Sequence, residues 1–186
     1  MITENENTTA AETASTSENT PADLSVDFNA PAIAHQKVKT CAAQKRLAIV
    51  TMGVKLGNET RGYTRFRKLS EMLVEHGYEV DLITSSFQHW EKKQRDKADP
   101  CYQGLPYNIV FIDEPGYKKN LDLGRIASHA KAAKNLRAYF NRAFESCETA
   151  YDLIYSEIPP NDVARVCAEA ADEYGIPYVA DINDLW

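Results

Sequence analysis

The sequence has no long hydrophobic run. Nowhere in its 186 residues does an apolar stretch approach the ~18 residues that mark a membrane-spanning helix. The amino-terminal end also has neither the basic segment nor the apolar segment of a secretory signal. We therefore expect a cytoplasmic protein without a transmembrane helix.

Cysteine is scarce, and the four cysteines are widely spaced: Cys41, Cys101, Cys147 and Cys167. They form no Cys-x-x-Cys pair, which is the spacing that most zinc sites share. Widely spaced cysteines in a cytosolic protein are reduced thiols by default. We therefore expect neither a metal site nor a disulfide framework.

Basic residues are missing from the first 30 positions, which instead carry acids and many Thr, Ala, Ser and Asn residues. Such a segment buries too little apolar surface to offset the entropy lost on ordering. The composition predicts a disordered acidic and polar tail over residues 1–45 and a single folded domain over residues 46–186. A solvated extension explains the tail better than a partner-binding segment does.

The folded part begins with a strand, a glycine loop, a helix and a second strand. Residues 46–52 are an apolar run rich in Ile and Val, typical of a buried strand. Glycines punctuate residues 53–62, and apolar residues then recur at helical spacing up to Gly77, a typical helix end. A second apolar run covers residues 78–84. This βαβ unit predicts a parallel sheet.

The rest of the chain repeats this alternation. Further strands are predicted at 107–112, 151–155 and 177–180, with helices at 121–147 and from about 161 to 174. Asn161 or Asp162 is expected to cap the last helix, and Gly175 to end it. Residues 85–106 read as a polar loop with two exposed aromatics, Phe87 and Trp90. The fold class is α/β with a doubly wound parallel sheet.

Two nucleotide-binding motifs are absent. The glycine loop matches neither the G-x-G-x-x-G of dinucleotide-binding enzymes nor the P-loop of NTPases, which argues against an oxidoreductase and an NTPase. Strand one also ends without the acidic pair of a receiver domain. Bases do crowd the start of the first helix, where an anion would relieve their opposition to the helix dipole. They are Arg61, Arg65, Arg67 and Lys68. Solvated surface bases are the competing interpretation.

Polar side chains follow each predicted strand, where ligands bind in open parallel sheets. The candidates are His89, Glu114, Tyr117, Glu157, Asp181, Asn183 and Asp184. Carboxylates and imidazoles at such an edge can orient or deprotonate a hydroxyl. Each one alone is as readily an exposed residue, a cap or an Asx-turn. Their gathering at one edge favours a binding or catalytic site.

Bases also dominate residues 117–142. This segment contains seven Lys or Arg residues and one acid, Asp122, in a chain of net charge −6. With Leu121, Leu123 and Ile126 nearby, this segment suits an anionic membrane surface. A solvated helix face is the simpler interpretation. No nucleic-acid-binding module accompanies the charge, so we expect no nucleic-acid partner.

In this order the segments resemble the N-terminal half of a GT-B glycosyltransferase, of the family 4 type used in bacterial capsule, O-antigen and exopolysaccharide biosynthesis. The resemblance covers residues 46–186. It rests on Arg61-Gly62-Tyr63-Thr64-Arg65 and on the runs at 75–84, 84–93, 113–117 and 151–155. The run Ala180-Asp181-Ile182-Asn183-Asp184-Leu185-Trp186 resembles the family's Asp-Ile-Arg-Asp-Leu-Trp-Pro, with Asn183 in place of Arg.

The resemblance implies two Rossmann-like domains that face a cleft. The N-terminal domain holds an acceptor, often a lipid-linked sugar at the cytosolic membrane face, and the other holds the nucleotide-sugar donor with paired glutamates. It also implies retention of configuration, no metal, and no cofactor beyond the nucleotide-sugar co-substrate. The second domain is missing from this sequence, which ends right after a strand. We therefore expect a truncated chain that is inactive alone.

Site roles follow as hypotheses. Gly57, Asn58, Arg61 and Gly62 would hold the acceptor phosphate or the donor diphosphate, and His89 and Glu157 would act at the reacting hydroxyl. Six further residues would bind substrate: Arg65, Phe87, Glu114, Tyr117, Asp181 and Asp184. The alternative is a non-catalytic α/β binding module for a phosphorylated ligand or a partner protein.

Overall fold

The computed structural model describes residues 44–121, 123–146 and 151–183. The tail expected at residues 1–45 therefore lies outside the described residues, apart from its last two positions. The expected substrate-binding residue Asp184 lies outside them as well.

The described residues form a parallel sheet of five strands in the order β5-β2-β1-β6-β7. Every neighbouring pair is parallel. The strands are β1 (Arg46–Val50), β2 (Glu79–Ser85), β5 (Asn108–Ile112), β6 (Leu153–Ile158) and β7 (Tyr178–Ile182). The predicted doubly wound α/β fold is thereby confirmed.

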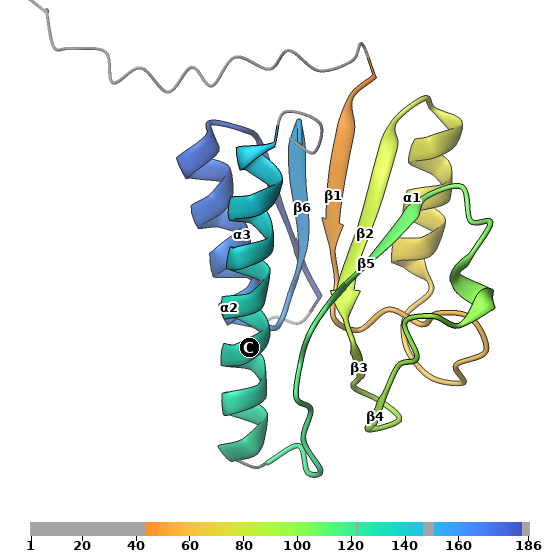
Figure 1. Ribbon diagram of the computed structural model, residues 1–186. Helices are drawn as coiled ribbons and strands as arrows, with labels where there is room; N and C mark the ends of the chain where they lie inside the picture. Colours follow the sequence, from red (N-terminus) through yellow and green to blue (C-terminus); the bar gives the residue numbers. More distant parts are fainter. Residues whose placement is uncertain (1–43, 122, 147–150, 184–186) are drawn as a thin grey trace, which may run out of the picture. The chain divides into compact units, whose positions relative to one another are not determined.

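Helices cover both faces of the sheet (Figure 1). Helix α1 (Arg65–Glu75) lies on one face, and α2 (Leu123–Glu145) and α3 (Asn161–Tyr174) lie on the other. The chain starts in the middle with β1, builds outward through β2 and β5, and then returns to place β6 on the other side of β1. The winding thus reverses between β1 and β6, which is where such sheets bind ligands.

Two apolar clusters fill the layers because successive side chains of a buried strand point to opposite faces. In β1, Ala48 and Val50 belong to the cluster under α2 and α3, where Leu136 and Phe140 are fully buried. Ile49 belongs to the cluster under α1, beside Phe66. A strand buried on both faces reads as a continuous apolar run, which is why residues 46–52 were recognisable in the sequence.

The segment expected to be a plain loop contains a small hairpin. Strands β3 (Phe87–Gln88) and β4 (Lys93–Gln94) pair antiparallel, and a 3-10 turn, η1, follows at Pro100–Tyr102. The expectation that Phe87 is exposed was wrong: its side chain is 4% exposed because it packs against the ring of Tyr117. Trp90 is indeed exposed.

Two boundaries also differ from the sequence-based prediction. Strand β6 continues past Tyr155 to Ile158, because Ser156 pairs with Val50 and Glu157 pairs with Asp181 in the sheet. Helix α3 begins at Asn161 with Pro160 as its N-cap, so neither of the two predicted cap residues serves as its N-cap. The predicted end at Gly175 is confirmed, with the glycine in the left-handed conformation.

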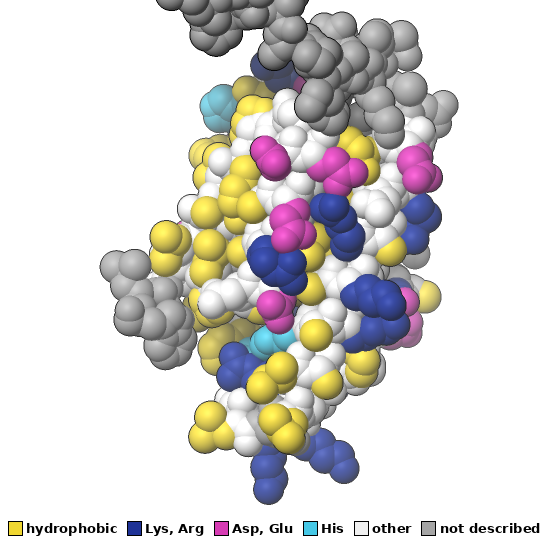
Figure 2. All heavy atoms as spheres, turned by 90° about the vertical axis from the view of Figure 1, so that its left-hand side faces the viewer, with side chains coloured by type: hydrophobic (Ala, Val, Ile, Leu, Met, Phe, Trp, Pro, Cys, Tyr) yellow, Lys and Arg dark blue, Asp and Glu magenta, His cyan; other side chains and the backbone are white. Residues whose placement is uncertain are grey.

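The outer surface of α2 and α3 is shown in Figure 2. Acidic and basic side chains are interspersed across the middle of this face, as on an ordinary solvated surface. Within the described ranges, no helix combines the length and the apolar composition that crossing a bilayer requires.

Candidate functional site

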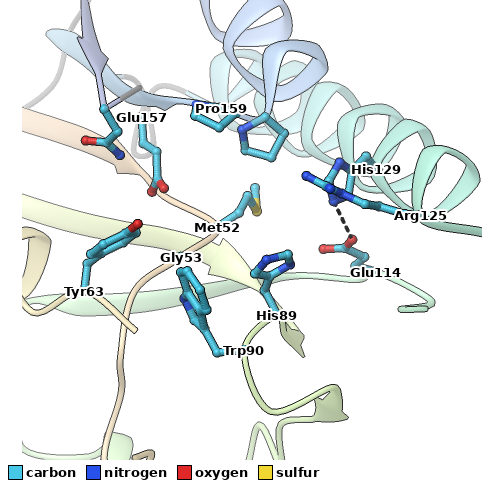
Figure 3. Close-up of a pocket in the computed structure, with 12 residues that line it drawn as sticks. Met52, Gly53, Tyr63, His89, Trp90, Glu114, Arg125, His129, Glu157 and Pro159 are labelled. Atoms are coloured by element: carbon cyan, nitrogen blue, oxygen red, sulfur yellow. Dashed lines mark ion pairs between the residues drawn. The ribbon is translucent and has the colours of Figure 1, made fainter. Parts of the chain in front are cut away.

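A cavity of about 200 Å³ lies at the carboxyl ends of the strands. Its walls come from segments far apart in the sequence (Figure 3). Met52 and Gly53 follow β1, and Glu157 and Pro159 come from β6 and the turn after it, so the cavity sits where the winding reverses. The remaining lining residues are Tyr63, His89, Trp90, Glu114, Arg125, His129, Pro160 and Asn183.

Glu157 projects into this cavity although its side chain is 5% exposed. The Thr51 hydroxyl donates a hydrogen bond to its carboxylate, and the Gly53 backbone N–H does the same. A side chain at position 53 would come within 3.1 Å of Oε1, so glycine allows this close approach. Burial raises the pKa of Glu157 above its ordinary value, since water cannot solvate the charged form.

His89 faces Glu157 across the cavity (Figure 3). Its Nδ1 is hydrogen bonded to the Tyr117 hydroxyl. Burial, followed by the positive charges of Lys92 and Arg125, lowers the pKa of His89 to about 4. Burial raises the pKa of Tyr117 to about 12. Near neutral pH the pair is therefore an uncharged imidazole and a phenol, which can exchange hydrogen bonds with a neutral hydroxyl.

Two serine hydroxyls hold Glu114 on the far wall, and His129 lies beside it. The hydroxyls of Ser85 and Ser128 donate to its two oxygens at 2.6 and 2.8 Å. The Nε2 of His129 lies 4.0 Å from its Oε1 (Figure 3). Burial lowers the pKa of His129, against the opposing effect of Glu114. Glu114 is thus fixed in place as an acceptor that can orient a polar ligand.

The rim adds an aromatic wall and a cation. The rings of Tyr63 and Trp90 meet edge to face with centroids 5.7 Å apart, and Trp90 also contacts His89. Arg125 lies on the opposite side (Figure 3). Such a cavity suits a ligand with several uncharged hydroxyl groups and one anionic group near Arg125. Among the residues that the structure describes, no cluster of His, Cys, Asp and Glu has the arrangement of a metal site.

A buried ion pair between Arg95 and Glu59 joins segments that carry lining residues of the site. The guanidinium of Arg95 binds both oxygens of Glu59 and also donates to the backbone carbonyls of Ser85 and Val54, each at 2.7 Å. Gln88 donates to Glu59 as well, at 2.9 Å. The glycine loop is therefore fastened to the end of β2 and to the β3–β4 hairpin.

The four residues of the predicted glycine-loop site do not line the cavity. Gly57 and Asn58 are exposed, with Gly57 against Cys101. Gly62 packs on the Gly53 carbonyl, and the Arg61 carbonyl accepts from Gln88. Their predicted role in holding a phosphate stays a prediction.

Arg65 and Asp181, both predicted to bind substrate, bind each other. The guanidinium of Arg65 lies 2.5 Å from Asp181 and also contacts Asn183, which lines the cavity. The Tyr155 hydroxyl donates to Asp181 at 2.6 Å. This group ties the end of β7 to the start of α1. The expected anion site at the start of that helix is therefore partly occupied by the protein's own carboxylate.

Of the predicted side chains, the structure brings His89, Glu114, Glu157 and Asn183 to the cavity wall, with Tyr117 behind His89 and Phe87 behind Tyr117. Sequence reasoning assigned no site role to several lining residues: Met52, Tyr63, Trp90, Arg125, His129 and Pro159. Their signal was weak, since Arg125 and His129 lie within a long helix rather than after a strand. Their spacing of four residues places both on one helix face, which could have drawn attention to them.

Comparisons with known proteins give the fold. No protein-family model and no curated protein matches this sequence. Among solved structures, LpCGTa in complex with UDP superposes with a TM-score of 0.50 at 11% identity, over 77% of this chain and 31% of that one. The chain therefore spans about a third of the length of LpCGTa. At this identity the similarity shows a shared fold alone.

Two other structures superpose less well. The C-terminal domain of PF1911 hydrogenase from Pyrococcus furiosus gives a TM-score of 0.48 at 19% identity, over 74% of this chain and 90% of that one. A ugt transferase from Siraitia grosvenorii, in complex with UDP, gives 0.44 at 13% identity, over 74% of this chain and 27% of that one.

Proposed function

We propose that this chain is the acceptor-side domain of a GT-B glycosyltransferase that transfers a sugar from a nucleotide-sugar donor to a lipid-linked glycan acceptor. The observation that carries the proposal is the joint position of Glu157, His89 and Glu114 around one cavity, at the reversal point of the sheet. The fold shared with LpCGTa, whose structure holds UDP, supports it. The finer assignment, to family 4 enzymes of cell-surface polysaccharide synthesis acting at the cytosolic membrane face, rests on the sequence resemblance.

Sugar transfer requires that the acceptor hydroxyl is oriented and deprotonated. In transfer, the hydroxyl oxygen forms a bond to the anomeric carbon, and the bond from that carbon to the nucleotide diphosphate breaks. In this proposal Glu157 accepts the hydroxyl proton, because burial makes its carboxylate more basic than an exposed one. Thr51 and Gly53 keep the carboxylate aimed into the cavity.

Fixed polar side chains and an aromatic wall orient the acceptor sugar. The uncharged His89 and the fixed carboxylate of Glu114 hydrogen bond to its hydroxyls, and the Tyr63–Trp90 wall packs against its ring. Arg125 faces the acceptor phosphate. The donor is bound by a second domain that this sequence does not include, so the proposal concerns the protein in which both are joined.

The test is sugar transfer by the product of the complete native gene, from a panel of labelled nucleotide sugars to lipid extracts and purified lipid-linked sugars. Glu157→Gln should lower kcat at least about 100-fold, the usual scale of a lost general base, with a smaller change in KM. Glu75→Gln is the matched control, since it changes an exposed glutamate of α1 in the same way.

Two outcomes would overturn the proposal. One is the absence of transfer from every nucleotide sugar in the panel. The other is a Glu157→Gln enzyme as active as the Glu75→Gln control. Binding of a phosphorylated ligand without transfer would instead support the non-catalytic binding module.

A further inference from the structure

Three large apolar side chains protrude at the start of α2. Leu121, Leu123 and Ile126 are 98%, 81% and 63% exposed, the highest values among the large apolar residues that the structure describes. Single exposed apolar residues are common on protein surfaces, but three within six positions form a contiguous apolar projection. Such an arrangement is unfavourable in water and indicates a surface that is covered in use.

The charge around this projection is positive. Lys118 and Lys119 are exposed just before it, and Arg125 lies within it. One acid, Asp122, belongs to the same stretch of sequence and lies outside the described residues, so the bases outnumber it. In Figure 2, apolar and basic side chains gather at the lower end of the face, and the described acidic side chains lie further up. The chain as a whole has a net charge of −6, so this local excess of bases runs against its overall sign.

The projection is continuous with the cavity. A surface hollow is lined by Asn120, Leu121, Leu123, Arg125, Ile126 and His129. Arg125 and His129 also line the cavity, so the hollow and the cavity share a wall. A ligand anchored at the projection therefore lies next to Arg125.

We infer that Leu121, Leu123 and Ile126, with Lys118, Lys119 and Arg125, form a docking surface for an anionic lipid bilayer. Charge complementarity selects this occupant, because apolar side chains ringed by lysines insert between anionic headgroups while the bases pair with them. The anionic bilayer repels the remainder of the acidic chain, which orients the protein with the projection toward the bilayer. The bilayer then lies beside the cavity entrance. The docking surface itself does not depend on the proposed function. Only the usefulness of having the bilayer beside the cavity rests on it.

The experiment is cosedimentation of the intact chain with vesicles of neutral lipid, and with vesicles that contain about 30% phosphatidylglycerol. We expect binding to the anionic vesicles alone, weakened by salt. The variant L121S/L123S/I126S should reduce the partition coefficient at least about tenfold. The variant K118Q/K119Q should reduce it by a similar factor.

Matched controls separate the docking surface from general apolar or basic character. Met72→Ser removes an exposed apolar residue of α1, on the other face of the sheet, and should bind as the unchanged protein does. K45Q/K68Q removes two exposed lysines outside the patch and should bind more tightly than K118Q/K119Q. Circular dichroism melting should show all variants folded, because the altered side chains are exposed.

Failure of the unchanged protein to bind anionic vesicles would overturn the inference. Binding of L121S/L123S/I126S as strong as that of the unchanged protein would overturn it as well. If size-exclusion chromatography instead showed that this variant abolishes self-association, the projection would be an interface between copies, and the bilayer assignment would be wrong. The vesicles contain no sugar donor, so loss of vesicle binding and loss of sugar transfer are separate results.

Discussion

The guanidinium of Arg95 lies against the carboxylate of Glu59, with nitrogen–oxygen distances of 2.6 and 3.0 Å, and both side chains are almost completely buried. The pair joins the glycine loop to a later stretch of the chain that contains the end of β2 and the β3–β4 hairpin. The pair therefore holds the loop that carries Tyr63 toward the hairpin that carries His89 and Trp90.

Arg95→Ala should destabilise the fold by about 3–5 kcal/mol, because it leaves a buried carboxylate without its cation. Urea unfolding followed by fluorescence measures the change. The double variant R95L/E59L, which removes both charges, should be more stable than either single variant. As a control, Arg165→Ala breaks an exposed pair with Glu169 and should leave the midpoint unchanged. If Arg95→Ala lowered the free energy of unfolding as little as this control does, the role given to the pair would be wrong.

The ring of His89 should stay neutral throughout the physiological range. Its pKa of about 4 in the folded protein is below the ordinary value of about 6.5 for an unfolded chain. The unfolded state therefore binds the proton first as the pH falls, so His89 reduces the free energy of unfolding between about pH 6.5 and pH 4. Resonance titration of the histidine rings by NMR measures the pKa directly, with His89→Gln to assign the signal. A midpoint near 6.5 would contradict the described burial.

Gly116→Ala should destabilise the fold more than Gly175→Ala. Both glycines have positive φ, +82° and +64°, so each alanine costs about 1–2 kcal/mol of backbone strain. At position 116 the new methyl group would also approach the Phe87 ring to 2.4 Å, whereas at 175 it meets nothing within 4 Å. Overpacking should add about 1–3 kcal/mol at position 116. Thermal melting of the two variants tests this difference, and equal melting temperatures would contradict it.

Cys167 should react with a thiol reagent only when the domain unfolds. Its side chain is on the buried face of α3, and burial raises its pKa to about 12, so the reactive thiolate is scarce. Cys101, which is partly exposed, should be labelled in the folded protein. Peptide mapping after labelling, with and without urea, distinguishes the two. Rapid labelling of Cys167 without denaturant would show that α3 opens locally.

The fold could be predicted because its signals are local. The apolar run at residues 46–52, the helical spacing that ends at Gly77 and the glycine at 175 each depend on neighbouring residues alone. Strand β6 was predicted too short because Ser156 and Glu157 are polar, and polar residues read as loop. Their strand conformation comes from pairing with β1 and β7, which are distant in the sequence.

The site could be predicted only in part. His89, Glu114 and Glu157 were found because the parallel topology brings the residues after each strand to one edge. Arg125 and His129 were missed because a helix reaches that edge by its packing angle, which composition does not encode. The predicted exposure of Phe87 failed for a similar reason, since the turn at Gly116 folds Tyr117 over it.

The hydrogen bond between Thr51 and Glu157 joins residues 106 positions apart. Contacts between residues so far apart in the sequence form slowly, because closing the long loop between them costs conformational entropy before the contact forms. The first half of the chain can pair β1 with β2 early, but the cavity has no second wall until β6 arrives beside β1. Ligand binding should therefore appear only in the last phase of refolding, and a ligand that fills the cavity should slow the unfolding of the whole sheet.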